Sequence, residues 1–279
     1  MIKPFFTSEY VTLYNHDCLE ILSTIPENSI NMIFADPPYM LSNDGFTCQN
    51  GKMVPVNKGK WDKSKGFEND TVFHEEWIAA CRRVLKPEGT IWISGTYHSI
   101  YQCGYILQKQ KFHMLNDIAW FKPNAAPNLS CRFFTASHET LLWARKDKKA
   151  KHIFNYDEMK GGYFPEDKLK KENTQMRSVW SIPTPKNEEK MFGKHPTQKP
   201  LSLLTRIVKA STSPGDIILD PFNGGGTTGI ASTIVGERFY LGIEIEKSYC
   251  ELTKERLGKI IKGGSPFGNP GAYPARQLA

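Results

Sequence analysis

The chain has 279 residues and an ordinary globular composition, with 39% hydrophobic and 23% charged residues, a formal net charge of +7 and a sequence pI near 9.0. No apolar run approaches the roughly 20 residues of a membrane span, and the N-terminus lacks the apolar core of a signal peptide, so we expect a cytoplasmic protein without membrane association. The six cysteines form no C-x-x-C pair, which disfavours a disulfide framework and a zinc site, and we expect no bound metal.

The first 70 residues contain short apolar segments that predict strands and one helix. We expect a strand over residues 11–14 and a helix over residues 18–25. Residues 30–35 (INMIFA) form a continuous apolar run, typical of a strand buried on both faces, and lead directly into Asp36-Pro37-Pro38-Tyr39. Residues 40–70 show little periodicity and predict a long loop, of the kind that is usually functional.

The middle of the chain continues to alternate between helix and strand. The expected elements are a helix over 72–85, a strand over 90–94, a helix over 100–110, and strands over 116–121 and 139–144. Such alternation predicts an α/β protein whose sheet is mostly parallel and has helices on both faces. Residues 145–195 interrupt the pattern and indicate an inserted, partly irregular region.

Regular structure returns after residue 200. The expected elements are a helix over 201–210, a strand over 217–219, a helix over 227–235, a strand over 239–243 and a helix over 249–261, which brings the expected sheet to seven strands. Residues 263–279 are rich in Gly, Pro and Ala and have no core-forming pattern. We therefore expect a single domain over residues 1–262, followed by a disordered tail.

The strongest cofactor signal is a glycine-rich loop between a strand and a helix, with the sequence Asp220-Pro221-Phe222-Asn223-Gly224-Gly225-Gly226-Thr227-Thr228. The following strand ends at Glu244, as in a nucleotide-binding βαβ unit. In such a unit the glycines let the ligand approach the backbone, and an acid accepts hydrogen bonds from ribose hydroxyls. The acid that precedes the loop favours a ligand with an amino group or a positive charge, as S-adenosylmethionine has.

Two alternatives for this loop remain open. No lysine follows Gly226, so a phosphate-binding P-loop is disfavoured. The spacing of Gly224, Gly226 and Gly229 also fits a dinucleotide-binding fold, and a purely structural glycine turn is the other alternative.

The position of this unit near the C-terminus predicts a permuted nucleotide-binding fold. Too few residues follow it to complete a sheet, so a neighbouring strand must come from elsewhere, and residues 11–17 are the natural candidate. Asp17 would then lie at the carboxyl end of that strand, beside the cofactor, because ligands of open α/β sheets bind outside those ends.

Asp36-Pro37-Pro38-Tyr39 has the residue types that methyl transfer to a ring-conjugated amino group requires. The lone pair of such a nitrogen is delocalised, and two acceptors for its N–H groups would redirect it and stabilise the developing positive charge. The Asp36 carboxylate and the Pro37 carbonyl can be those acceptors, and Tyr39 offers a flat face for an extruded base. The alternative is a proline turn that merely ends the strand.

Together the motifs resemble the β group of DNA amino-methyltransferases, in which the DPPY motif precedes the cofactor loop, over about residues 11–261. The resemblance implies a circularly permuted, Rossmann-like methyltransferase fold, S-adenosylmethionine as cofactor, and a catalytic motif made of Asp36, Pro37, Pro38 and Tyr39. The cofactor-binding residues that it implies are Asp17, Cys18, His195, Thr197, Lys199, Asp220, Phe222, Asn223, Gly224, Gly226, Thr227 and Glu244. By the same resemblance Glu244 would bind the ribose, Asp17 the adenine amino group of the cofactor, and residues 195–200 the methionine part.

Residues 127–134 and 193–200 are more specifically similar to the second methyltransferases of DpnII-type restriction-modification systems. These enzymes modify adenine in GATC and also accept single-stranded DNA. The similarity implies that DNA, double-stranded or single-stranded, is the substrate and that residues 124–195 are a target-recognition region. It also implies a cognate restriction endonuclease encoded nearby and a homodimer.

The charge distribution agrees with a nucleic-acid surface in that region. Residues 145–199 contain 14 Lys and Arg against 8 Asp and Glu, which accounts for nearly all of the net charge. A solvated lysine-rich surface is the alternative, but beside the motifs above the excess favours phosphate contacts. The candidate DNA contacts are Arg132, Lys148, Lys149, Lys151 and Arg177.

Three other functions are weighed against adenine methylation. An N4-cytosine methyltransferase more often has Ser in place of Asp36, so the carboxylate favours adenine. A non-catalytic DNA-binding protein with a methyltransferase fold is disfavoured by the intact motifs. RNA modification is disfavoured by the resemblance alone.

Overall fold

The computed structural model describes residues 2–40, 46–49, 52–55, 59, 62–162, 164, 167, 171 and 173–261. The tail expected over residues 263–279 lies outside the described residues. None of the described helices is both long and apolar enough to cross a lipid bilayer. Nor does the described part of the chain bring three His, Cys, Asp or Glu side chains together in a way that could hold a metal ion.

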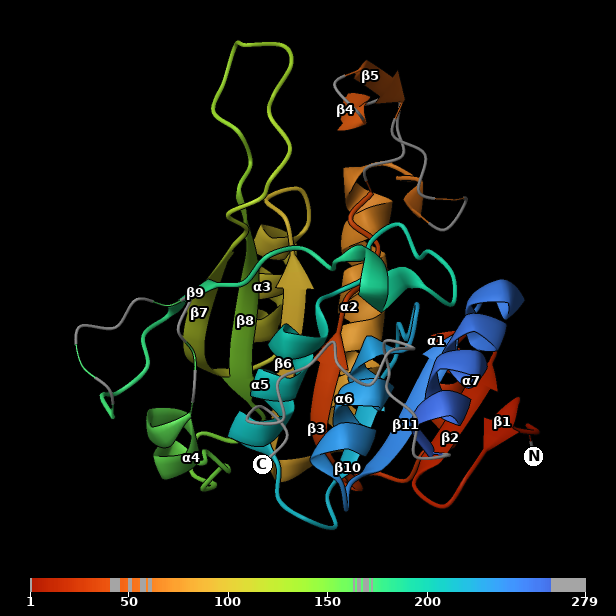
Figure 1. The fold of residues 1–279 in the computed structure, drawn as a ribbon. Coiled ribbons are helices and arrows are strands. Elements are labelled where there is room, and N and C mark those ends of the chain that lie inside the picture. The colour runs from red at the N-terminus through yellow and green to blue at the C-terminus, as the bar shows by residue number, and fades with distance from the viewer. Residues whose placement is uncertain are drawn as a thin grey trace.

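A nine-stranded sheet runs through the described part of the chain (Figure 1). Its strand order is β1 (Phe6–Thr7), β2 (Val11–Asn15), β11 (Phe239–Glu244), β10 (Ile217–Asp220), β3 (Ile30–Ala35), β6 (Leu85–Gly95), β8 (His138–Arg145), β7 (His113–Phe121) and β9 (Val179–Ser181). Seven of these are the strands expected from the sequence, and the short β1 and β9 extend the sheet at its two edges. Most neighbouring strands are parallel, whereas β8 runs antiparallel to both of its neighbours.

The permuted order of the fold is confirmed by the pairing of β2 with β11. The two strands are parallel, with Val11 opposite Tyr240 and Asn15 opposite Glu244. The Asn15 amide donates hydrogen bonds of 2.9 Å to the carbonyl oxygens of Glu244 and Ile245, which fixes this register at the strand ends. The N-terminal strand thus completes the nucleotide-binding unit at the other end of the chain.

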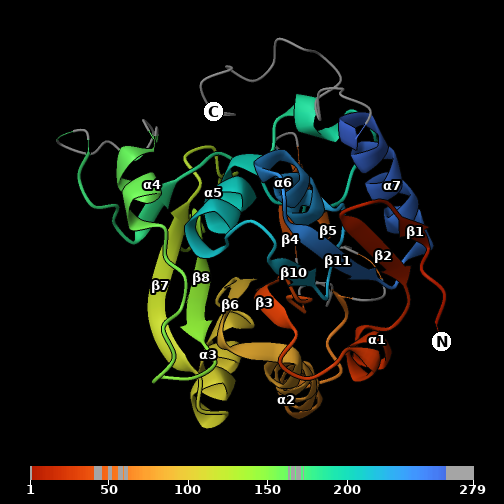
Figure 2. The same cartoon turned by 90° about the horizontal axis from the view of Figure 1, so that it is seen from below.

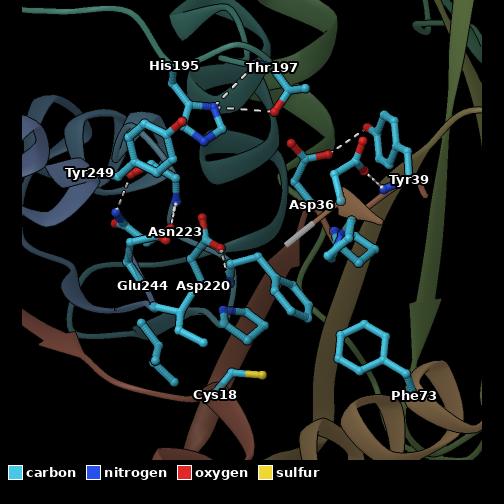
Figure 3. A pocket seen from close by; sticks show the side chains of 18 of the residues that line it. Cys18, Asp36, Tyr39, Phe73, His195, Thr197, Asp220, Asn223, Glu244 and Tyr249 are labelled. Carbon is cyan, nitrogen blue, oxygen red and sulfur yellow. Dashed lines mark hydrogen bonds between the residues drawn. The ribbon is translucent and has the colours of Figure 1, made fainter. Parts of the chain in front are cut away.

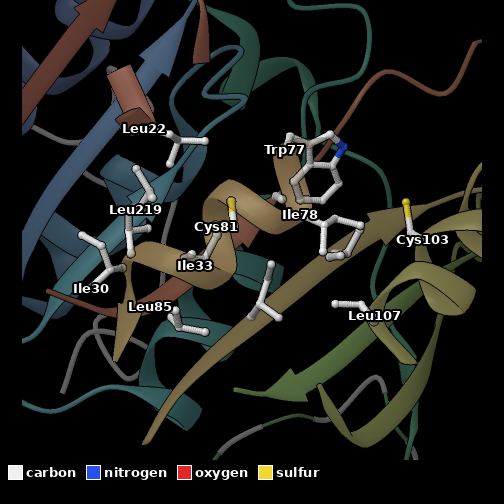
Figure 4. Close-up of a cluster of buried hydrophobic side chains, with 14 of the residues drawn as sticks. Leu22, Ile30, Ile33, Trp77, Ile78, Cys81, Leu85, Cys103, Leu107 and Leu219 are labelled. Atoms are coloured by element: carbon white, nitrogen blue, oxygen red, sulfur yellow. The ribbon is translucent and has the colours of Figure 1, made fainter. Parts of the chain in front are cut away.

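Helices cover both faces of the sheet (Figure 2). One layer consists of α1 (Cys18–Thr24), α2 (Phe67–Val84) and α3 (Ile100–Lys109), and the other of α5 (Leu201–Ser211), α6 (Thr227–Val235) and α7 (Lys247–Ile261); the short α4 (Tyr156–Gly161) packs on α5. Each layer encloses an apolar core against the sheet. In the core of the first layer, Trp77 and Ile78 of α2 lie against β3 and β6 (Figure 4). These two cores hold the strand ends, where the motifs lie, in fixed relative positions.

The loop expected over residues 40–70 is wrong in two places. A hairpin of β4 (Phe46–Gln49) and β5 (Lys52–Pro55) forms within it. Helix α2 begins at Phe67, five residues before the expected start, because the Asp70 carboxylate accepts hydrogen bonds from the Ser64 hydroxyl and the Lys65 backbone N–H and so organises the first turn. Strand β6 likewise begins at Leu85, before the expected residue 90.

Candidate active site

The two sequence motifs meet where the chain changes direction across the sheet. Strands β3 and β10 are parallel neighbours, with Ile33 opposite Leu219. From β3 the chain crosses to β6 on one side, and from β10 it crosses to β11 on the other. Ligands of open α/β sheets bind outside the carboxyl ends of strands at such a point. Here those ends carry Asp36 and Asp220 (Figure 3).

A cavity of about 530 Å³ lies at this edge and is lined by both motifs. Its size is within the range of roughly 300–1,000 Å³ that is usual for small-molecule sites. Tyr39 and Phe222 line the same cavity, so the two loops share one cleft. The Phe222 ring is held from behind by Trp77 of α2, with ring centroids 5.3 Å apart in an edge-to-face contact.

The Asp220 carboxylate is buried and fixed in place by two hydrogen bonds. Its two carboxylate oxygens accept hydrogen bonds from the Thr228 hydroxyl at 2.6 Å and the Phe222 backbone N–H at 3.0 Å. Burial raises the pKa of this carboxyl to about 7, and the charges of Asp36 and Glu244 add to the rise. A buried acid with a raised pKa is stabilised in its ionised form when a positive ligand group lies beside it.

Glu244 joins the glycine loop to the end of β11. Its carboxylate accepts hydrogen bonds from the Gly224 backbone N–H at 2.7 Å and from the Glu246 backbone N–H at 2.9 Å. Gly224 has a φ of 51°, and a Cβ atom there would lie 3.2 Å from the His195 ring, so only glycine keeps this wall of the cavity clear. A carboxylate keeps further lone pairs for ligand hydroxyls after it has accepted two hydrogen bonds.

All but one of the other predicted cofactor residues line the cavity. Asp17, Cys18, His195, Thr197 and Lys199 line the cavity, as do Asn223 and Thr227. Asp17 also caps α1 by accepting from the Leu19 backbone N–H at 2.8 Å. The Asn223 side chain donates a hydrogen bond to Thr253 and accepts one from Tyr240, so it also stabilises the loop. Gly226 does not line the cavity; it has a φ of 76° and lets the chain pass close to Thr253 at the start of α6.

S-adenosylmethionine fits this site by volume, by charge and by backbone shape. Its ribose requires acceptors for its hydroxyl groups, and the Glu244 carboxylate lines the cavity; its cationic groups require an acid and its adenine amino group an acceptor, and Asp220 and Asp17 line the same cavity. Gly224 and Gly225 have no side chains of their own at this edge of the cavity, and the His195 ring lies over Gly224. His195 packs edge-on against Tyr249, with ring centroids 4.3 Å apart, and closes the cavity beside this loop (Figure 3).

The predicted catalytic motif lies in a buried network of charges. The Tyr39 hydroxyl lies 2.6 Å from Asp36 Oδ1 and 2.9 Å from Glu139 Oε2. The Tyr39 ring is only 5% exposed, with its hydroxyl at 3.1 Å from the Ser94 hydroxyl, so the stacking of a base on its face stays a prediction. Burial raises the pKa of Asp36, and the Lys199 ammonium offsets only part of that rise.

Lys199 lines the cavity and also contacts the predicted catalytic motif. Its Nζ donates to Asp36 Oδ2 at 2.5 Å and lies 3.6 Å from Glu139 Oε2. Glu139 in turn accepts from Lys122 Nζ at 3.1 Å. No local sequence pattern points to Glu139 or Lys122, because it is the pairing of β7 with β8 that brings them together.

The candidate DNA contacts separate into two ends of the sheet. Arg132 is exposed on the loop between β7 and β8, which extends beyond the carboxyl ends of β3 and β6 (Figure 1). Lys148, Lys149 and Lys151 are also exposed, but they follow β8. Because β8 runs antiparallel to β6, these three lysines lie at the opposite end of the strands from Asp36. Arg177 is exposed just before β9, at the outer edge of the sheet.

Comparisons with known proteins agree with this geometry. The family model described as DNA methylase matches residues 30–255. The chain is 49% identical over 261 residues to the type II methyltransferase M2.MboI of Moraxella bovis, covering 93% of this chain and 92% of that protein. It is also 49% identical over 258 residues to the type II methyltransferase M2.DpnII of Streptococcus pneumoniae, covering 92% of this chain and 93% of that protein.

Solved structures show the same architecture. The crystal structure of the M1.HpyAVI–SAM complex aligns with a TM-score of 0.64 at 30% identity, covering 88% of this chain and 98% of that one. The cytosine-N4-specific PvuII DNA methyltransferase aligns with a TM-score of 0.67 over 99% of this chain and 92% of that one. Its identity is 17%, so it supports the fold and nothing finer.

Proposed function

This chain belongs to the DNA methylase family, and from that premise we propose that it methylates the N6 amino group of adenine in DNA, within the sequence GATC. The cofactor of this family is S-adenosylmethionine, which supplies a methyl group bound to a positively charged sulfur. The observation that carries the proposal is the position of Asp36 and Asp220 at the ends of neighbouring strands, where they line one cavity. That arrangement brings a site for a cationic donor next to acceptors for an amine.

The residues of the catalytic motif would activate the amino group through hydrogen bonds alone. The Asp36 carboxylate would accept one N–H of the substrate amine and the Pro37 carbonyl the other. These two acceptors turn the nitrogen lone pair out of conjugation with the ring and stabilise the positive charge that develops on the nitrogen. Because the methyl group passes directly to the nitrogen, the chain needs no nucleophile of its own.

The choice of adenine over cytosine rests on the carboxylate at position 36. Methyltransferases that act on the N4 of cytosine more often have Ser at this position, and Ser offers no negative charge to the developing cation. The target base must leave the duplex to reach the cavity. Arg132 lies on the β7–β8 loop, which extends past the strand ends that carry Asp36. It is therefore the residue that we propose to contact DNA beside the cavity.

The names of the relatives support a wider setting for the activity. M2.MboI and M2.DpnII are type II methyltransferases. We therefore infer that this chain protects DNA in a restriction-modification system, with a cognate endonuclease encoded nearby, in the cytoplasm. A homodimer and activity on single-stranded DNA belong to the same proposal.

Sequencing of DNA from cells that express the protein, with detection of modified bases, tests the proposal. We expect N6-methyladenine at GATC sites and none in cells without the protein. Methylated adenine in another context would contradict the recognition sequence alone. N4-methylcytosine would overturn the choice of base, and unmodified DNA from cells with abundant soluble protein would overturn the activity.

A further inference from the structure

Among the residues that the structure describes, two side chains donate hydrogen bonds to Asp36, and both also reach Glu139. The Tyr39 hydroxyl lies 2.6 Å from Asp36 Oδ1 and 2.9 Å from Glu139 Oε2. The Lys199 ammonium lies 2.5 Å from Asp36 Oδ2 and 3.6 Å from the same oxygen of Glu139. Both oxygens of Asp36 are therefore occupied, and both of their donors have the same second acceptor.

The Tyr39 hydroxyl can be in one of two hydrogen-bonded states. The Tyr39 hydroxyl has one proton, so it can donate to Asp36 or to Glu139 but not to both at once. The Ser94 hydroxyl lies 3.1 Å from the Tyr39 oxygen and 3.4 Å from Glu139 Oε2, so it can donate to Glu139 while the tyrosine donates to Asp36. A small rotation of the hydroxyl is enough to transfer the hydrogen bond.

The charges of the cluster are balanced in both states. Two carboxylates, Asp36 and Glu139, face two ammonium groups, those of Lys199 and Lys122. Burial by itself would raise the pKa of Glu139, but the charges of Lys199 and Lys122 outweigh it and lower that pKa to about 2. Glu139 is thus an anionic acceptor near neutral pH. All four side chains are at least four-fifths buried, so their pairing is only weakly screened by solvent.

We propose that Glu139 is a positioning residue that takes over the Tyr39 hydroxyl and the Lys199 ammonium when a substrate amine reaches Asp36. The transfer leaves lone pairs of Asp36 open to the N–H groups of the amine, while the negative charge of Asp36 is kept. No covalent bond changes in this step. The inference rests on the proposed function, since it concerns the same amine.

The position of Glu139 in the chain adds a second property. Lys122 directly follows β7 and Glu139 lies in the second position of β8, so their ion pair of 3.1 Å closes the base of the loop that carries Arg132. The loop tip is organised by Asn128, whose amide donates to the Phe133 carbonyl at 2.8 Å. The residue that holds the catalytic tyrosine therefore also anchors the loop proposed to contact DNA.

The test is the replacement Glu139→Gln, which keeps the size of the side chain and removes its charge. We expect the single-turnover rate of methylation at saturating cofactor and DNA to fall by about 10- to 100-fold, since the acceptor of the amine is then blocked more of the time. The dissociation constant of S-adenosylmethionine and the KM for DNA should change by less than about threefold. The matched control is Glu88→Gln, an exposed acid that should leave the rate unchanged.

Two further readouts separate positioning from a merely structural role. Burial, the Lys199 charge and the Glu139 charge together set the pKa of Asp36, which also faces Tyr39 and Asp220. The loss of the like charge of Glu139 should move the acidic limb of the rate profile to lower pH. In a Tyr39→Phe background, where no hydroxyl needs to be moved, Glu139→Gln should cost clearly less than in the wild type.

The outcomes are distinct. If the wild type methylates DNA and Glu139→Gln does so at the same rate, the positioning role is overturned and the proposed function stands. Additive losses in the Tyr39→Phe background would also contradict it. If the wild type forms no methylated base, both proposals fail. Should Glu139→Gln not fold, Glu139→Asp, which keeps the charge but withdraws it by one methylene, must show the same reduction in rate without loss of cofactor affinity.

Discussion

Asp36 and Asp220 stand at the carboxyl ends of two hydrogen-bonded parallel strands, β3 and β10, and the charge of one affects the titration of the other. Burial raises the pKa of Asp220 to about 7, and Asp36 contributes to the rise. Asp220 at the cofactor end of the cavity and Asp36 at its catalytic end are thus coupled electrostatically.

Binding of S-adenosylmethionine should strengthen as the pH rises through about 7, the pKa of Asp220. Above that pH the carboxyl is ionised and attracts a cation, and below it the protonated form does not. The dissociation constant, measured by calorimetry, should therefore fall severalfold between about pH 6 and pH 8. A constant affinity across this interval would show that Asp220 does not face the charge of the cofactor.

DNA binding should weaken steeply with added salt, because phosphate contacts release counterions. Arg132→Ala should reduce the slope of log affinity against log salt by about 1, the effect of one phosphate contact. Lys148→Ala is the matched control. This exposed lysine lies at the opposite end of the strands from Asp36, so its substitution should leave the slope unchanged. The reverse result would place the DNA on the other edge of the molecule.

The inserted region should depend on one buried ion pair for its attachment. Arg206 of α5 and Asp167 are both 3% exposed and lie 2.9 Å apart, and the guanidinium packs over the Trp180 ring at 4.8 Å. Asp167→Ala removes a buried carboxylate that pairs with this guanidinium, which should cost about 3 kcal/mol of unfolding free energy in urea titrations. Lys209→Ala removes a more exposed pair with Glu158 and should cost less than about 1 kcal/mol. Equal effects of the two variants would contradict this account.

Gly226→Ala should damage the cofactor loop. The residue has a left-handed backbone, and a Cβ atom would lie 2.5 Å from Thr253 Cγ2. The backbone conformation costs about 1–2 kcal/mol, and the crowding adds about 1–3 kcal/mol. Gly258→Ala, in α7 with open space around it, should instead stabilise the protein slightly. Denaturant titration of both variants checks this; a neutral Gly226→Ala would show that the loop adapts freely.

The parts of the site predicted from sequence are those that local pattern determines. A buried strand that runs into Asp36-Pro37-Pro38-Tyr39, and another that runs into the glycine loop, must both end at the carboxyl edge of a parallel sheet. Their positions follow from the strands that carry them. The same reasoning identified residues 11–17 as the missing neighbour of β11, since a buried strand without a partner is costly.

The parts that sequence could not predict depend on contacts between distant segments. Glu139 meets Tyr39 only because β8 returns antiparallel beside β6, so that Thr140 lies opposite Gly95. The same reversal carries Lys148 to the opposite end of the strands, although it follows Glu139 closely in sequence. The β4–β5 hairpin likewise consists of short segments that prefer the strand conformation only weakly. Their pairing with each other stabilises the strands.

The most direct test of the central claim compares the wild type with Asp36→Ala on a GATC duplex with S-adenosylmethionine, using mass spectrometry to identify the methylated nucleoside. The account predicts N6-methyladenine from the wild type and a loss of at least about 100-fold in the variant, because an acceptor for the developing charge is removed. Cofactor affinity should be nearly unchanged, since Lys199 can still pair with Glu139. Near-normal turnover by Asp36→Ala would contradict the account.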